Sequence, residues 1–189
     1  MSHPVHSYIV LLTLFLLGAV LFIQGYLLSR QNQHFLGNPA IKTPWFITGK
    51  ITLFASWGLF IVKAINPELD WFILFQPLPW LALIMLIPGS VIMAISFFNL
   101  GTSLKVGLPE QGTILKTKGV YRISRNPLYL GVYLITIASC LYFPDIINIL
   151  LALIGMIIHH LITLSEEKFL SARFGQEYDN YRKKVRRYL

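Results

Sequence analysis

The chain has 189 residues, of which 55% are hydrophobic and only 13% are charged, and its formal net charge is +8. Soluble domains carry about 25% charged residues, so this composition excludes an ordinary soluble domain and indicates a membrane protein. The single cysteine, Cys140, excludes an internal disulfide and provides no zinc-ligand set.

Five apolar runs predict an all-α polytopic membrane protein with about five transmembrane helices, because each run approaches the ~20 residues that cross a bilayer. The runs cover residues 8–28, 45–65, 80–100, 127–143 and 146–164, and the fourth is the shortest. The first run is too long for the core of a signal peptide, so we expect it to be retained as a helix. The absence of any GxG sequence and of alternating strands and helices excludes a Rossmann-type nucleotide site.

The basic residues indicate how the chain is oriented. They gather in the first and third connections and in the tail, as Arg30, Lys42, Lys105, Lys116, Lys118, Arg122, Arg125, Lys168, Arg173, Arg182, Lys183, Lys184, Arg186 and Arg187. With five spans these three regions share one side, and the positive-inside rule makes that side cytoplasmic. We therefore expect an external N-terminus and a cytoplasmic C-terminus. Topology and attraction to anionic headgroups account for the positive charge, so membrane lipids are the expected partners and nucleic acid is not.

The N-terminal part, residues 1–100, is expected to hold three of the helices. A lysine interrupts the second apolar run, and a Pro-Gly pair interrupts the third. Lys50 lies inside the second run, near enough to a helix end for its long side chain to reach the headgroups. Pro88-Gly89 interrupts the third run and is expected to kink that helix.

The C-terminal part, residues 101–189, begins with a long connection that ends in "GVYRISRNPLYLG". Pro127 suits the first turn of a helix, and Asn126 before it is a candidate N-cap. The helix start, together with Arg122 and Arg125, would form a corner that attracts anions. Composition alone is equally compatible with arginines that only mark the cytoplasmic side.

Residues 127–165 are expected to form a tight helical hairpin, because only "PDI" separates the fourth and fifth runs. The tail after it is expected to be an amphipathic helix or pair of helices, broken near Gly175. An apolar stripe formed by Phe174, Tyr178, Tyr181 and Val185 would lie on the membrane surface or pack back over the hairpin.

The end of the fifth run, "HHLITLSEE", places His160, Thr163 or Leu164, and Glu167 along one helix face. Histidines and glutamates at the end of a membrane helix are costly unless they face protein or water. Adjacent acids point in different directions, so we expect at most one of Glu166 and Glu167 to face a site.

Together these strings resemble the isoprenylcysteine carboxyl methyltransferase family, integral membrane enzymes that use S-adenosylmethionine. The matching segments are "GVYRISRNPLYLG", the short hairpin and "EEKFLSARFGQEYDNYRKKV". The resemblance covers about residues 100–187, and phospholipid methyltransferases share the same C-terminal pattern. It implies a cofactor site beneath the cytoplasmic loop and tail.

The resemblance assigns cofactor contacts to nine positions: Thr113, Ile114, Leu115, Lys116, Tyr121, Asn126, Pro127, Leu128 and Tyr129. Lys116 or Arg122 would suit the carboxylate of the cofactor. The acidic position of the family falls on Glu166 or Glu167. Relatives usually have histidine where this chain has Asn126, and an amide cannot serve as a base near neutral pH. The substrate-side arginine of the family has no match, and its candidate replacements are His159, His160, Arg125 and Arg173.

The expected reaction is O-methylation of the carboxylate of a prenylcysteine or similar lipid-linked substrate that enters from the bilayer. A carboxylate is already ionised and needs a positioning cation, whereas an amine would need a base, for which Glu167 is the candidate. No metal is required. A phospholipid amine N-methyltransferase, an NADPH-dependent membrane reductase of similar C-terminal pattern, and a membrane scaffold or transporter subunit remain as alternatives.

Overall fold

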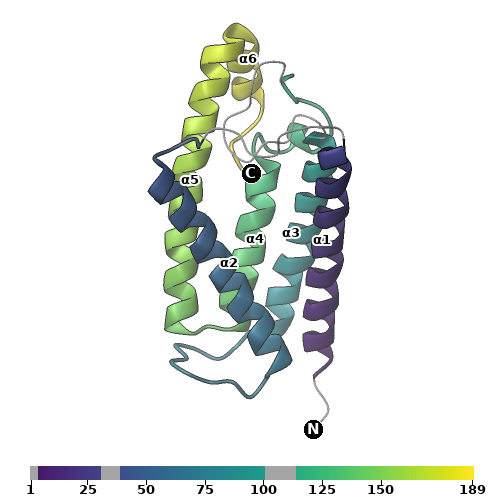
Figure 1. Ribbon diagram of the computed structural model, residues 1–189, viewed down its shortest axis with the longest axis vertical. Helices are drawn as coiled ribbons and strands as arrows, with labels where there is room; N and C mark the ends of the chain where they lie inside the picture. Colours follow the sequence, from purple (N-terminus) through teal and green to yellow (C-terminus); the bar gives the residue numbers. More distant parts are fainter. Residues whose placement is uncertain (1–3, 31–38, 101–113) are drawn as a thin grey trace.

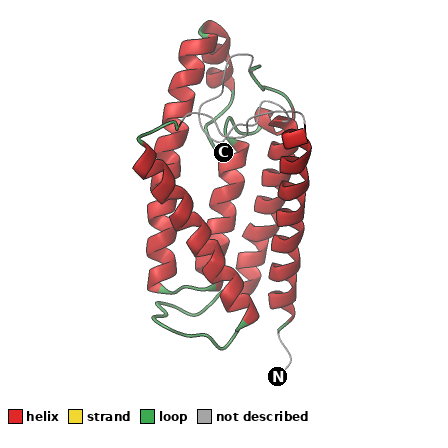
Figure 2. Ribbon diagram, in the orientation of Figure 1, coloured by secondary structure: helices red, strands yellow, loops and turns green. Residues whose placement is uncertain are grey.

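The computed structural model describes residues 4–30, 39–100 and 114–189, and these ranges contain helices and no strands (Figures 1 and 2). The helices in chain order are α1 (Val5–Arg30), α2 (Thr43–Ile65), α3 (Pro79–Leu100), the 3-10 turn η2 (Gly119–Arg122), α4 (Pro127–Tyr142), α5 (Ile146–Phe174) and α6 (Gln176–Lys184). The N-terminus lies at one end of the bundle, and α6 lies at the other (Figure 1).

The chain is a polytopic helical membrane protein. Among the described helices, α1, α2, α3 and α5 are long and apolar enough to cross a membrane. All five apolar runs are helical as predicted, but α4 has 16 residues and is therefore only about 24 Å long. It is shorter than the ~30 Å hydrocarbon core and lies inside the bundle, between α3 and α5 (Figure 1).

Glycines allow the helices to approach closely at two crossings. A Cβ atom on Gly131 of α4 would lie 2.7 Å from the carbonyl oxygen of Gly89 on α3. A Cβ atom on Gly49 of α2 would lie 2.5 Å from Ile158 of α5, and one on Gly155 would lie 2.8 Å from Leu53. Small residues commonly mark such contacts in membrane proteins, where helices associate through packing. The second crossing brings α2 diagonally across α5 and fixes which residues of α2 reach the α5 surface.

The predicted hairpin of α4 and α5 is present, and the buried Asp145 organises its turn. Asp145 is the N-cap of α5, and its Oδ1 accepts a hydrogen bond from the backbone N–H of Ile147 at 2.8 Å. Its Oδ2 accepts one from the N–H of Phe72 at 2.8 Å, which ties the turn to the connection between α2 and α3. At the other end α5 continues beyond residue 165, the predicted end of the hairpin, to Phe174.

The tail turns back at Gly175, whose φ of +50° is a conformation that favours glycine. The break was predicted at this residue. Tyr178 and Tyr181 of α6 are buried, and the hydroxyl of Tyr181 donates to the carbonyl of Tyr121 at 2.6 Å. Of the two predicted placements, the structure has the tail packed back on the chain beside the start of α4.

Candidate functional site

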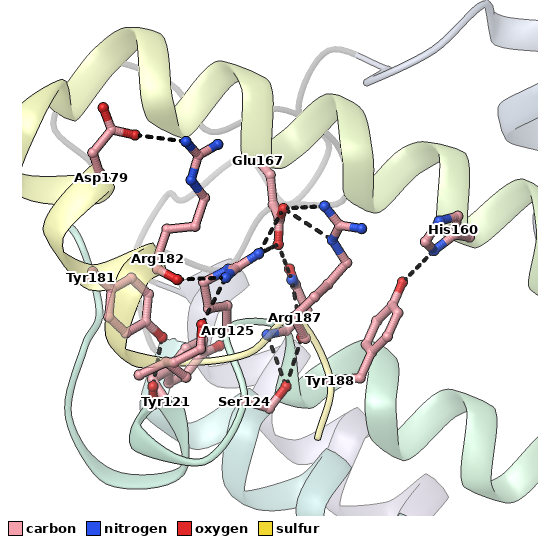
Figure 3. Close-up of polar contacts among 12 residues, drawn as sticks. Tyr121, Ser124, Arg125, His160, Glu167, Asp179, Tyr181, Arg182, Arg187 and Tyr188 are labelled. Carbon is pink, nitrogen blue, oxygen red and sulfur yellow. Dashed lines mark hydrogen bonds and ion pairs between the residues drawn. The ribbon is translucent and has the colours of Figure 1, made fainter.

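Glu167, near the end of α5, lies at the centre of a polar cluster that joins three distant parts of the chain (Figure 3). Its Oε1 accepts hydrogen bonds from Nε and Nη2 of Arg125 at 3.2 and 3.1 Å and from Nδ2 of Asn126 at 2.8 Å. Its Oε2 accepts from Nε and Nη2 of Arg187 at 3.1 and 3.0 Å and from Nη2 of Arg125 at 3.2 Å. A carboxylate offers about four lone-pair sites, so these six contacts saturate it.

Arg125 uses every nitrogen of its guanidinium on protein groups. Besides its bonds to Glu167, its Nη1 donates to the carbonyls of Arg182 and Val185 at 3.1 and 2.7 Å. Its side chain is 8% exposed, as is that of Glu167. Arg125 was predicted to be a catalytic cation and part of an anion-receptive corner, but its donors are already occupied. Arg122, the other arginine of that corner, is exposed.

The last residues of the chain pair with the segment that leads into α4. The backbone N–H groups of Arg125 and Asn126 donate to the carbonyls of Arg186 and Arg187 at 2.9 and 3.2 Å. The hydroxyl of Ser124 also donates to the Arg187 carbonyl, at 3.0 Å. Residues 185–188 therefore form part of the site. Arg187 and Ser124 were not among the predicted site residues.

His160, predicted to be catalytic, faces this end segment. Its Nδ1 lies 2.8 Å from the hydroxyl of Tyr188, which in turn lies 3.3 Å from the hydroxyl of Tyr133 on α4. The Tyr188 ring packs edge-on against the Tyr133 ring, with centroids 5.2 Å apart. Tyr188 thus bridges α4 and α5.

Glu166 also contacts α4, whereas at most one of the two adjacent acids was expected to face a site. Its Oε1 accepts a hydrogen bond from the hydroxyl of Tyr129 at 2.8 Å. The other acid, Glu167, contacts Asn126, which precedes Tyr129 by three residues. The start of α4 therefore meets both carboxylates. The second oxygen of Glu166 accepts no hydrogen bond within the described part of the chain.

Two residues on the α2 side complete the polar surroundings of Glu166. Lys50 of α2 is close enough to Glu166 and His159 to interact with both electrostatically. His159 is 2% exposed, and its Nδ1 lies 2.8 Å from the carbonyl of Gly155. Because a carbonyl only accepts, Nδ1 carries a proton in this contact. Lys50 was predicted only to reach the headgroups, and its neighbours on α5 were not expected.

The tail that covers the cluster contains phenols that stay neutral at ordinary pH. Burial raises the pKa of Tyr178 to about 12, and it raises the pKa values of Tyr181 and Tyr121 as well. The hydrogen bonds to Glu167 raise the pKa of Arg187, which keeps this arginine charged. These groups hold the tail in place by packing and pairing.

The predicted cofactor residues divide into two groups. Tyr121 lies in η2, whereas Asn126, Pro127, Leu128 and Tyr129 lie at the start of α4, where Asn126 contacts Glu167 and Tyr129 contacts Glu166. Ile114, Leu115 and Lys116 lie in the connection before η2 and make no hydrogen bond within the described residues, and Ile114 is 69% exposed. Thr113 lies outside the described residues.

Asn126 occupies the N-cap position as predicted, but its side chain does not cap the helix. Its amide donates to Glu167 instead. The first N–H groups of α4 therefore have no side-chain partner among the residues that the structure describes, and such groups suit a carboxylate like that of S-adenosylmethionine. The residues present are compatible with this cofactor.

Comparison with known proteins adds one finding. The model of a family described as phospholipid methyltransferase matches residues 78–177, more than half of the chain. The match runs from the end of the connection before α3 into α6, so it includes Asn126, Glu166 and Glu167. No curated protein matches the chain.

Proposed function

We propose that this chain, which belongs to the phospholipid methyltransferase family of membrane enzymes, methylates the carboxylate of a lipid-linked acceptor such as a prenylcysteine. S-adenosylmethionine would supply the methyl group, activated on its sulfonium. An acceptor oxygen would take that methyl group and leave the thioether as the product, so the task of the protein would be to align the two reactants and to exclude water.

The saturation of Glu167 is the observation that supports a carboxylate acceptor. With six hydrogen-bond contacts from Arg125, Asn126 and Arg187, this carboxylate has no lone pair left to accept a proton. In this proposal Glu167 does not act as a base, the role for which it was a candidate with an amine acceptor. An acceptor that is already ionised needs no base, which agrees with this arrangement.

Several residues would hold the cofactor in this proposal. The uncapped N–H groups at the start of α4 would bind its carboxylate, and the Asn126 side chain would line the same end of the helix. Lys116 or Arg122, both in the preceding segment, would add positive charge. Glu167 would act through Arg125 and Arg187, by fixing the tail against α4.

A phospholipid amine is the second candidate acceptor, and Glu166 is the reason to keep it. One oxygen of Glu166 accepts from Tyr129, and the other is uncommitted within the described residues, so it could accept a proton from an ammonium group. The description of the matched family also supports this candidate.

The test is methyl transfer from labelled S-adenosylmethionine by the purified protein in lipid nanodiscs. N-acetyl-S-farnesylcysteine and phosphatidylethanolamine would be offered separately, with wild-type protein and with Glu166→Gln. We expect the farnesylcysteine to be methylated and Glu166→Gln to retain that activity. Methylation of phosphatidylethanolamine alone, abolished by Glu166→Gln, would replace the first acceptor with the second.

The cofactor is tested apart from the acceptor. Calorimetric titration with S-adenosylhomocysteine and with NADPH should show binding of the first and not the second. If NADPH alone bound, the proposed use of S-adenosylmethionine would be wrong.

A further inference from the structure

Lys50 is a cation within a helix that is long and apolar enough to cross a membrane, and it has no ion-pair partner in the described part of the chain. Its Nζ lies 5.2 Å from the centroid of the Phe46 ring, and within the described residues it forms neither a hydrogen bond nor an ion pair. An ammonium group at this depth is costly unless it reaches water, headgroups or a ligand. By contrast, the two arginines beside Glu167, Arg125 and Arg187, are both ion-paired with that carboxylate.

The packing of α2 on α5 fixes the position of this charge. Gly49, the residue before Lys50, lies against Ile158 and His159. Before the start of α2, the carbonyl of Ala40 accepts a hydrogen bond from the hydroxyl of Ser165. The chain therefore runs antiparallel to α5 in this region, and the stretch of α5 from His159 to Ser165 lies beside residues 49 back to 40.

The side chain of Lys50 extends along that stretch. Helical side chains tilt toward the helix N-terminus, and the contact with the Phe46 ring, four residues earlier, shows that Lys50 does so. The ammonium group therefore lies beside α5 between the levels of His159 and Glu166. Its electrostatic interactions with both residues agree with this position.

The charges on the two sides of the site differ. On the tail side, Glu167 is neutralised by Arg125 and Arg187. On the α2 side, Glu166 is hydrogen-bonded to the neutral Tyr129, and Lys50 approaches without forming an ion pair. An anion that entered between α2 and α5 would meet an ammonium group that donates no hydrogen bond to any residue described by the structure.

We propose that Lys50 binds the anionic group of the methyl acceptor, a carboxylate or a phosphate, at the α2 side of the Glu166 carboxylate. This inference rests on the proposed function, because it names the residue that recognises the acceptor of that reaction. It also supplies the positioning cation for which the sequence offered His159, His160, Arg125 and Arg173. In the structure the guanidinium of Arg125 is hydrogen-bonded to Glu167 and to carbonyls of the tail, and His160 is hydrogen-bonded to Tyr188.

The experiment measures discrimination between matched charged and neutral ligands in nanodiscs that contain S-adenosylhomocysteine. One pair is N-acetyl-S-farnesylcysteine and its carboxamide, which tests a carboxylate. The other is dioleoylglycerol phosphate and dioleoylglycerol, which tests a phosphate. A hydrogen bond between Lys50 and a charged group should make the affinity for the anionic ligand about tenfold higher than that for its neutral counterpart. We expect wild-type protein to show this preference for one pair, and that pair identifies the anion.

Three variants give the test its controls. Lys50→Gln should lower the preference to about one, and Lys50→Arg should keep most of it. Lys42→Gln removes an exposed lysine just before the same helix and should leave the preference unchanged. If Lys50→Gln kept the wild-type preference, or weakened the charged and neutral ligands equally, Lys50 would be an interfacial anchor and the inference would be wrong.

The ligand experiment and the transfer assay test different proposals, so a negative result in one can be told apart from a negative result in the other. A wild-type protein that methylates neither acceptor contradicts the proposed function. A wild-type protein that methylates an acceptor, but whose Lys50→Gln variant still prefers the anion, contradicts only the role of Lys50.

Discussion

Arg187 holds Glu167 through two parallel hydrogen bonds, from Nε at 3.1 Å and from Nη2 at 3.0 Å, across twenty positions of the chain. Paired donors of this kind are stronger and more directional than single ones. They bring the last residues of the chain to the end of α5, where Arg125 reaches the same carboxylate from the segment that leads into α4. The tail is therefore part of the site.

Arg187→Ala should loosen the tail, and Arg186→Ala should not. The Arg187 side chain is 35% exposed, so solvent screening limits its contribution to about 1 kcal/mol. Arg186 is exposed, and the site uses only its backbone carbonyl. Limited proteolysis of the tail checks this: Arg187→Ala should be cut several times faster than wild type. Equal cleavage of the two variants would contradict the role of the Arg187 side chain.

Glu167→Gln should destabilise the protein more than the loss of either arginine. It leaves Arg125, which is 8% exposed, without its counter-charge, and such a change costs about 3–5 kcal/mol. The thermal unfolding midpoint in detergent should fall by several degrees. Glu177→Gln, an exposed acid on α6, is the control and should leave the midpoint unchanged. Similar midpoints for both variants would show that the Glu167 cluster does not hold the tail.

Gly131→Ala tests the close crossing of α3 and α4. The new Cβ would lie 2.7 Å from the Gly89 carbonyl oxygen and 2.8 Å from the Cβ of Met93. Overpacking of this kind costs about 1–3 kcal/mol. Gly58→Ala is the matched control, because no atom lies within 4 Å of its Cβ. There alanine should stabilise the helix by about 0.5–1 kcal/mol. The two thermal midpoints should therefore move in opposite directions.

Alkaline pH should release the tail. Burial raises the pKa of Tyr178 to about 12 and also raises that of Tyr181, whereas an unfolded tyrosine titrates near about 10. The folded tail thus favours the neutral phenols. Their contribution to stability is complete below about pH 10 and declines as the pH rises toward 12. Protease sensitivity of the tail should increase over this interval, and Tyr178→Phe should shift the increase to higher pH. A tail that resists protease across the interval would contradict the prediction.

The helices were predictable from the sequence because their signals are local. The five apolar runs, the Asn126-Pro127 step and Gly175 each specify a helix, its start or its break within a few residues. The hairpin followed from the short connection around Asp145. The shortness of α4 was also visible, since its run was the shortest of the five.

The partners of the site residues were not predictable in the same way. Whether Arg187 reaches Glu167 depends on how the tail turns at Gly175, which the helical pattern does not specify. Glu166 was expected to point away from Glu167, yet both carboxylates contact the start of α4, Glu166 through Tyr129 and Glu167 through Asn126. Asn126 was expected to cap its own helix, but a carboxylate from α5 competes for its amide. Lys50 was considered only in relation to the bilayer, because nothing in its sequence neighbourhood indicates α5.

The contact between Arg187 and Glu167 also sets an order of events during synthesis. Ribosomes add about 5–20 residues per second, so Arg187 is made about one to four seconds after Glu167, twenty positions earlier. Arg125 and Asn126 precede Glu167 in the chain, so Arg187 is the last of the four cluster residues to be made, and the complete set of partners exists only once the end segment has been synthesised.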